Sequence, residues 1–413
     1  MKRMIQPDAG WSDRLMVRLR GVLLYARIGI LAAAVVLPLK ATATEGALRE
    51  AFQATLAELR TTYGFPGVTA AYVLRDGTVG VAASGLADVE AGRPMSPQTR
   101  MLSASIGKTF VAATAVALAR ENGLSLETPV AQWLGDRPWF GRLPNHGDMT
   151  LRHLLTHTSG LPDHVHLKSF AADVSRRGNE AGNPFQPESL VAYVIDEKPL
   201  FNAGEGWHYT DTGYILVGLV IESIAGRGCF DEMIDRFVAP LGLTLTGPAD
   251  RRELAGLATG YTSTNNSFGF PAKTVDVEGK LAWHPGIEWA GGGWVSNSRD
   301  LACWGAALFG GDAIQENDLD DLLRSVSVSR DNSDIRYGAG VAVCRASPFG
   351  PIYGHGGWIP GYISSLRYYA RHGISIAFQI NTDQLPEHDS EVAVKAMENR
   401  LIRVVLSAVE KGQ

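Results

Sequence analysis

Cysteine is scarce in this sequence. Its 413 residues include three cysteines, Cys229, Cys303 and Cys344, and no two of them form a Cys-x-x-Cys pair. Three cysteines are too few for a disulfide framework. One bridge plus one free thiol would fit an oxidising compartment, but we expect buried, unpaired thiols.

An excess of positive charge is also absent. Lysine and arginine number 38 against 43 aspartates and glutamates, so the net charge is -5 at pH 7. Nucleic-acid binding needs a basic surface, and a nucleic acid is therefore not expected as a partner. Apolar residues make up 45% and charged residues 20%, which is ordinary for a soluble globular enzyme. The length allows one large domain or two modest ones.

The apolar run near the N-terminus, Ile28–Leu39, is too short to span a bilayer comfortably. A segment rich in lysine and arginine precedes it, and Ala41-Thr42-Ala43 follows. A positive flank, a short apolar core and a small-x-small site predict a secretory signal peptide over residues 1–43. The alternative is an uncleaved membrane anchor that includes Gly21–Leu39, and Met16 is an alternative start. Both interpretations predict export, to the periplasm or out of the cell, and the anchor would add membrane association.

The two ends of the remaining chain carry regular patterns. Apolar residues at helical spacing predict one helix at 44–60 and a closing helix at Glu391–Val409. Val68–Leu74 and Val79–Ala83 predict a hairpin whose Asp-Gly turn supplies the positive φ. Ser105–Asn122 is an alanine-rich, apolar helix that the next glycine ends. Three further strands, joined by short turns and therefore antiparallel, are expected at 353–357, 363–369 and 374–380.

Between these patterns, over about residues 124–285, short helical stretches alternate with loops rich in glycine, proline, asparagine and aspartate. The arrangement predicts an α+β fold, in which N- and C-terminal helices flank an antiparallel sheet and a mostly helical subdomain is inserted. Residues 44–413 would form this domain, with the sheet part over about 44–123 and 286–413.

Ser105-Ile106-Gly107-Lys108 is the only Ser-x-x-Lys in the chain. At a helix start, residues i and i+3 share a face, so the ammonium of Lys108 can reach the hydroxyl of Ser105. Serine is a poor nucleophile until a base removes its proton. An N-cap serine followed by a surface lysine is the alternative, but the helix is apolar nearly all round, which argues against a surface lysine.

With its surroundings, this motif resembles the serine β-lactamase and penicillin-binding protein family. Gly85-Leu86-Ala87-Asp88, Gly123-Leu124-Ser125-Leu126 and the string His153–Pro162 resemble its branch of class C β-lactamases, D,D-peptidases and related esterases. The resemblance covers nearly all of residues 44–413. It implies a β-lactamase/transpeptidase-like fold, with Ser105 as nucleophile and Lys108 as its activating neighbour. We interpret the string His153–Pro162 as scaffold.

The resemblance implies a second motif, Tyr-x-Asn or Ser-x-Asn, about a hundred residues after the nucleophile. Tyr209-Thr210-Asp211 stands there, and Tyr209 would shuttle the proton between Ser105 and the leaving group. Asp211 departs from the usual asparagine, because a carboxylate only accepts hydrogen bonds and would hold Lys108 protonated. That favours Tyr209 over Lys108 as proton acceptor. Ser263-Thr264-Asn265 is a rival match, but no apolar helix follows it.

The resemblance also implies a Lys-Thr-Gly or His-x-Gly strand beside the nucleophile. His355-Gly356-Gly357 fits, and its glycines would let a substrate backbone lie close. The N–H groups of Trp358 and Ser105 would form the oxyanion hole. Gly356 lacks the hydroxyl that binds a substrate carboxylate, which weakens the case for an efficient β-lactamase. His284-Pro285-Gly286 is a rival match that Pro285 makes unsuitable as a strand.

Histidines at positions 153, 157, 164 and 166 raise the alternative of a zinc site. The glutamate of a His-Glu-x-x-His motif is missing, so we expect neither a metal nor a cofactor. The predicted function is a serine hydrolase that forms an acyl-enzyme on a D-alanyl peptide, a β-lactam or an ester. D,D-carboxypeptidase or esterase activity is favoured. The alternatives are a class C-like β-lactamase and a catalytically silent homologue that binds peptidoglycan or assembles with itself.

Overall fold

The computed structural model describes residues 36–178, 180, 182–266, 268–329, 334–384 and 390–412. Most of the predicted signal peptide, residues 1–43, therefore lies outside the described residues, and its cleavage stays a prediction. Within the described ranges, no single helix has the length and apolarity of a membrane span, and one pair of helices bent by 76° meets the criterion only jointly.

Nine strands among the described residues form one antiparallel sheet, in the order β3-β2-β1-β12-β11-β10-β9-β8-β7. The two ends of the chain meet at its centre, where β1 pairs with β12 and Ala71 lies opposite Ala377. The predicted hairpin is β1 and β2, and its turn contains Gly77 with φ at 84°. The strands are β1 Gly67–Val73, β2 Val79–Asp88, β3 Arg93–Pro94, β7 Val326–Ser327, β8 Ile335–Tyr337, β9 Ala342–Cys344, β10 Ile352–Ile359, β11 Tyr362–Tyr369 and β12 Ile374–Ile380.

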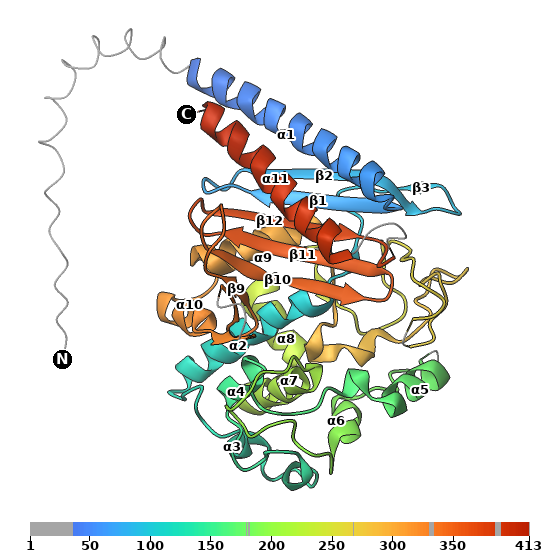
Figure 1. Cartoon of the computed structure of the whole chain (residues 1–413), viewed down its shortest axis with the longest axis vertical. Helices are drawn as coiled ribbons and strands as arrows, with labels where there is room; N and C mark the ends of the chain where they lie inside the picture. The colour runs from blue at the N-terminus through green and yellow to red at the C-terminus, as the bar shows by residue number, and fades with distance from the viewer. Residues whose placement is uncertain are drawn as a thin grey trace, which may run out of the picture.

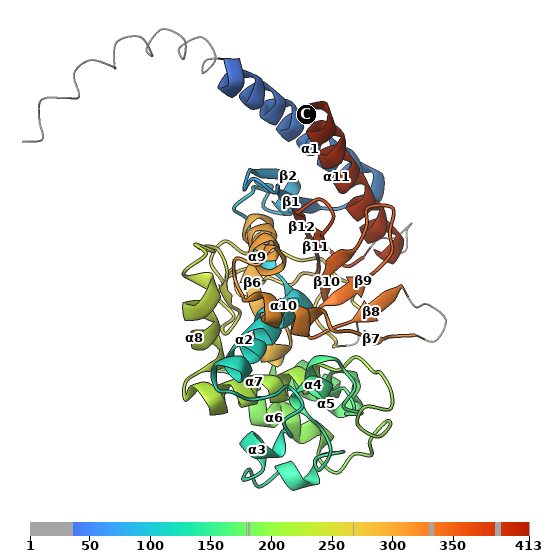
Figure 2. The same cartoon turned by 90° about the vertical axis from the view of Figure 1, so that its left-hand side faces the viewer.

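Helices α1 (Val36–Tyr63) and α11 (Ser390–Gly412) lie side by side on one face of this sheet (Figure 1). Both predicted terminal helices are thus confirmed, and the buried residues Leu48, Phe52, Leu56 and Leu59 pack α1 against the sheet. Helix α9 (Ser298–Gly310) covers the opposite face (Figure 2). The fold class predicted from the sequence is confirmed.

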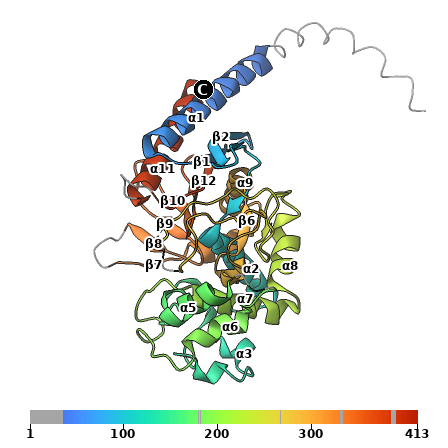
Figure 3. The same cartoon turned by 90° about the vertical axis from the view of Figure 1, so that its right-hand side faces the viewer.

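The helical part lies at the far end of the molecule from α1 and α11 (Figure 3). Its helices fall within the predicted insertion: α3 Ala131–Leu134, α4 Leu151–Leu155, α5 Lys168–Arg177, α6 Pro187–Val191, α7 Asp211–Ala225 and α8 Cys229–Met233. Helix α10 (Glu316–Leu323) lies outside it. A small sheet of β4 Met101–Leu102, β6 Trp294–Ser296 and β5 Gly247–Pro248 was not predicted.

Two apolar helices carry the site. Helix α2 (Gly107–Glu121) is buried along nearly its whole length and packs against α7, which is also buried on most sides. The chain enters α2 through a 3-10 turn, Ala104–Ile106, and leaves it at Gly123, whose φ is 63°. Ala104 has φ at 48°, an uncommon conformation for a residue with a Cβ, directly before Ser105.

The three cysteines are unpaired, as predicted. Cys229 is buried, as predicted, but the predicted burial is wrong for Cys303 and Cys344, which are partly exposed.

Candidate active site

Ser105 and Lys108 lie one turn apart at the start of α2. The ammonium of Lys108 donates a hydrogen bond to Ser105 Oγ at 3.0 Å. Ser105 is partly buried, while Lys108 is fully buried. The spacing in the sequence therefore predicted the contact correctly, and the alternative of a surface lysine is wrong.

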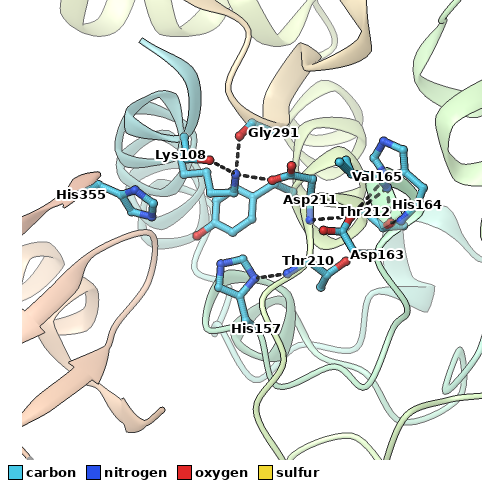
Figure 4. Close-up of polar contacts among 12 residues, drawn as sticks. Lys108, His157, Asp163, His164, Val165, Thr210, Asp211, Thr212, Gly291 and His355 are labelled. Atoms are coloured by element: carbon cyan, nitrogen blue, oxygen red, sulfur yellow. Dashed lines mark hydrogen bonds and ion pairs between the residues drawn. The ribbon is translucent and has the colours of Figure 1, made fainter. Parts of the chain in front are cut away.

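Lys108 also donates to the carboxylate of Asp211 and to the carbonyl oxygen of Gly291 (Figure 4). Burial alone would lower the pKa of Lys108, but the negative charge of Asp211 and the adjacent Tyr209 outweigh it and raise the pKa above its usual value. The lysine is therefore an ammonium at neutral pH. This agrees with the role that the sequence assigned to Asp211.

Tyr209 lies beside Ser105 and Lys108 and is the third candidate catalytic residue. Lys108 Nζ lies 4.9 Å from the centroid of its ring. The hydroxyl is buried and has no partner at good hydrogen-bond geometry among the described residues, while Lys108 and Ser105 lie close enough to lower its pKa. Burial raises the pKa of Tyr209 to about 12, although the charge of Lys108 acts in the opposite direction. Lys108 thus stabilises the phenolate of Tyr209, but the cost of burying the phenolate charge is larger. The phenol therefore stays protonated at neutral pH.

The ring of His157 packs against the ring of Tyr209, a contact that the sequence did not predict. Its ring lies 4.2 Å from the Tyr209 ring, between centroids. Its Nδ1 accepts a hydrogen bond from the Thr210 N–H at 3.2 Å (Figure 4). Burial lowers the pKa of His157 well below its usual value, so the ring is neutral. The sequence feature that contains His157 is the string His153–Pro162, to which the sequence alone assigns a scaffold role.

Strand β10 brings His355, Gly356, Gly357 and Trp358 beside the nucleophile, as predicted. A Cβ at Gly357 would lie 2.2 Å from the carbonyl oxygen of Ser103, so the strand passes the nucleophile turn closer than any other residue would allow. The oxyanion-hole role of the Trp358 and Ser105 N–H groups stays a prediction. The Trp358 side chain is 51% exposed, at the mouth of the site.

His355 forms a hydrogen bond with a residue that the sequence did not identify as part of the site. Its Nε2 lies 2.8 Å from the hydroxyl of Tyr337, on β8. Burial lowers the pKa of His355 to about 3, so the imidazole is neutral. His355 is therefore a hydrogen-bonding element of the strand rather than a positive charge for the substrate.

These residues open into a cavity of about 380 Å³ lined by Ser105, Tyr209, Asp211 and His355. One wall is apolar and consists of Val165, Phe170, Phe268, Ile287, Ile359 and Pro360. Another wall is acidic, because Asp163 and Glu288 join Asp211 there. Neither Asp163 nor Glu288 was predicted.

Asp163 is 5% exposed and holds the start of α7. Its Oδ1 accepts hydrogen bonds from the N–H groups of Asp211, at 3.2 Å, and Val165, at 3.3 Å (Figure 4). The first residues of a helix lack intrahelical acceptors, so this carboxylate satisfies one of the free donors of α7. Burial and the charge of Asp211 nevertheless raise the pKa of Asp163 to about 8.

Glu288 is partly buried, between the 3-10 turns Pro285–Ile287 and Trp289–Gly291. Its side chain makes no hydrogen bond or ion pair with a described residue. A Cβ at Gly292 would lie 2.5 Å from its Oε2 and 2.7 Å from the backbone carbonyl carbon of Ala104, so the carboxylate and the nucleophile turn both lie against this glycine. Burial, followed by the charge of Asp211, raises the pKa of Glu288 to about 8.

The alternative motifs lie in local turns. Ser263 Oγ accepts from the Asn265 N–H at 3.1 Å, and His284 Nδ1 accepts from the Gly286 N–H at 3.1 Å. The histidines considered for zinc have other roles: the side chain of His153 belongs to the capping box of α4, and His164 lies 2.9 Å from Thr212 Oγ1. Within the described residues, no three histidine, cysteine or acidic side chains are arranged to hold a metal.

Comparisons with known proteins agree with the fold. A family model described as Beta-lactamase matches residues 52–398. Penicillin-binding protein 4* of Bacillus subtilis (strain 168) is 26% identical over 77% of this chain and 68% of its own length. Esterase EstB of Burkholderia gladioli is 34% identical over 39% of this chain, and the match spans 41% of that protein, less than half of its length.

Among solved structures, a D-stereospecific amidohydrolase from Streptomyces sp. superposes with a TM-score of 0.70 at 27% identity. The match covers 86% of this chain and 98% of the amidohydrolase.

Proposed function

Because this chain belongs to the beta-lactamase family and is a serine hydrolase of that fold, we propose that it cleaves D-amino-acyl amides and esters through an acyl-enzyme on Ser105. One observation carries the proposal: Lys108 donates to Ser105 Oγ at 3.0 Å inside a cavity that Tyr209 also lines. The relatives supply the substrate class, because their names include a penicillin-binding protein, an esterase and a D-stereospecific amidohydrolase.

The reaction needs a proton acceptor for Ser105. Lys108 is held as an ammonium by Asp211, so the acceptor is the phenolate of Tyr209, a minor form at neutral pH. Ser105 Oγ attacks the acyl carbon as its proton passes to Tyr209, and Tyr209 then protonates the departing amine or alkoxide. Water hydrolyses the ester on Ser105 by the same transfers in reverse. Lys108 stabilises the phenolate and orients Ser105.

Two features favour amides and esters over β-lactams. Gly356 offers no hydroxyl for a substrate carboxylate. Asp163, Asp211 and Glu288 line the cavity, and the described lining residues include no lysine or arginine that would bind a substrate carboxylate. The catalytically silent alternative is disfavoured because Ser105, Lys108 and Tyr209 are all present and adjacent.

Parallel assays of wild type and Ser105→Ala test the proposal. The substrates are D- and L-phenylalanine p-nitroanilide, p-nitrophenyl butyrate, a D-Ala-D-Ala peptide and a chromogenic cephalosporin. We expect turnover of the D-anilide and the ester, a stable adduct of fluorophosphonate on Ser105 by intact-mass spectrometry, and neither in Ser105→Ala. No turnover of any substrate and no adduct would refute the enzyme; rapid cephalosporin turnover would establish the β-lactamase instead.

We also infer export from the N-terminal pattern. N-terminal sequencing of protein from the extracytoplasmic fraction is expected to begin near residue 44. An intact N-terminus in the membrane fraction would support the anchor that includes Gly21–Leu39, and the intact chain in the cytoplasm would refute export.

A further inference from the structure

Among the described residues, more carboxyl groups than cationic groups line the cavity beside Ser105. Asp163, Asp211 and Glu288 line it, and the buried Lys108 forms an ion pair with Asp211. Lys108 is already bonded to Asp211 and to the Gly291 carbonyl oxygen. The described lining residues include no lysine or arginine. Within the described residues, Asp163 and Glu288 therefore have no lysine or arginine partner, and the histidines nearest Asp163 are His164 and His166, each with a ring nitrogen 3.8 Å from a carboxylate oxygen.

The two remaining groups present free acceptors to the cavity. Asp163 uses Oδ1 for two backbone N–H groups, while its Oδ2 has only the exposed His166 nearby, with Nε2 at 3.8 Å. Glu288 has no hydrogen bond or ion pair within the described part of the chain. A buried carboxyl without a partner costs free energy, which a cationic ligand would recover.

We propose that Asp163 and Glu288 form a binding subsite for a primary ammonium group on the acyl part of the substrate. This inference rests on the proposed acyl transfer to Ser105. Lys108 is bonded both to Ser105 Oγ and to Asp211, so an ammonium on the carbon next to the scissile carbonyl would lie between Ser105 and these carboxyl groups. An ammonium has three N–H donors, which match the free oxygens of Asp163 and Glu288 together with Asp211.

The apolar wall defines the rest of the acyl group. Phe170, Phe268 and Ile287 line the same cavity as the carboxyl groups. A substrate whose α-carbon carries an ammonium and an aromatic or aliphatic side chain places each on its matching wall. The substrate class is therefore the esters and amides of apolar α-amino acids with a free amino group.

Binding of the ammonium would also assist the chemistry. The charge of Asp211 raises the pKa of both Lys108 and Tyr209. A cation placed against Asp211 offsets that charge and increases the fraction of Tyr209 phenolate. The amino group of the substrate is thus expected to increase kcat as well as to lower KM.

The test compares two acyl groups in the full chain: D-phenylalanine p-nitroanilide and 3-phenylpropionyl p-nitroanilide, which lacks only the amine. The readout is the ratio of their kcat/KM values. We expect a ratio of about 100 or more in wild type, since hydrogen bonds between charged groups are worth about tenfold to a hundredfold each. Glu288→Gln and Asp163→Asn are each expected to lower the ratio at least about tenfold.

Both substitutions keep the shape of the side chain, and asparagine at 163 can still accept the two backbone hydrogen bonds. Glu278→Gln is the matched control, because it removes the same charge from an exposed loop residue; its ratio should equal that of wild type. If Asp163→Asn does not fold, Glu288→Gln decides alone.

The possible failures are distinguishable. If wild type hydrolyses neither anilide and no ester, the proposed function fails. If it hydrolyses both acyl groups with a ratio near one, or if Glu288→Gln keeps the full ratio, the ammonium subsite is refuted while the hydrolase stands.

Discussion

The Asp211→Asn variant is expected to hydrolyse neutral esters faster than wild type at the same pH. The substitution restores the asparagine that is usual in the Tyr-x-Asn motif. It keeps an oxygen that can accept from Lys108, but it removes the negative charge that raises the pKa of Lys108 and Tyr209. The pKa of Tyr209 should therefore fall from its raised value of about 12.

The size of the shift follows from Coulomb's law. Two unit charges about 6 Å apart in an effective dielectric constant of about 20 interact by about 3 kcal/mol, or about two pKa units. Burial and the charge of Asp211 raise the pKa values of Asp163 and Glu288 to about 8, so these two groups ionise more readily once Asp211 is neutral and return part of this charge. A net shift of about one unit remains, which means a rate about tenfold higher.

The assay is kcat/KM for p-nitrophenyl butyrate between pH 6 and 9.5. If Tyr209 must lose a proton, log kcat/KM rises with pH in wild type, and the rising limb of Asp211→Asn is displaced by about one unit to lower pH. Asp136→Asn, an exposed residue of the helical part, should overlay wild type. An unshifted limb, or a slower variant at every pH with an unchanged Tm, would refute Tyr209 as the proton acceptor.

Three further outcomes are expected. Tyr209→Phe should lower kcat by about 100-fold or more without lowering Tm, since the lost hydroxyl has no hydrogen-bond partner among the described residues. Gly357→Ala should lower both Tm and kcat, because its Cβ meets Ser103 O at 2.2 Å, whereas Gly356→Ala, with its nearest atom at 3.9 Å, should keep its Tm. The folded pKa of Glu288, about 8, lies above its unfolded value, so this carboxyl group lowers the stability progressively as the pH rises from about 4.5 to 8. In urea unfolding, the free energy of unfolding of Glu288→Gln should match that of wild type near pH 5 and exceed it above pH 8 by at most a few kcal/mol, roughly. The same pH dependence of stability in both proteins would refute the raised pKa.

Local patterns were enough to predict much of the fold. The terminal helices, the β1–β2 hairpin and strands β10 to β12 are long enough for the spacing of apolar residues to identify them. Strands β3, β7, β8 and β9 have only two or three residues, and no periodicity can be recognised over that length. Their position at the two edges of the sheet depends on pairing with longer strands.

The site divides in the same way. Ser105 and Lys108 are three residues apart, so helix geometry alone predicts their contact. Tyr337 and Glu288 come from segments far along the chain, and they reach the site only through tertiary packing. Asp163 follows Leu-Pro in the sequence and reads there as a solvated turn residue. Nothing local indicates that it is buried under α7.

The unpredicted carboxyl groups change how the departure at Asp211 is understood. Considered alone, an aspartate beside Lys108 would lower the activity, because it forms an ion pair with the ammonium and raises the pKa of Tyr209. Together, Asp211, Asp163 and Glu288 form a group of carboxyl side chains whose additional cationic partner would be supplied by the ligand. The nucleophile is then most reactive when a cationic acyl group is bound, so the same three carboxyl groups would determine both which substrate binds and when Ser105 is activated.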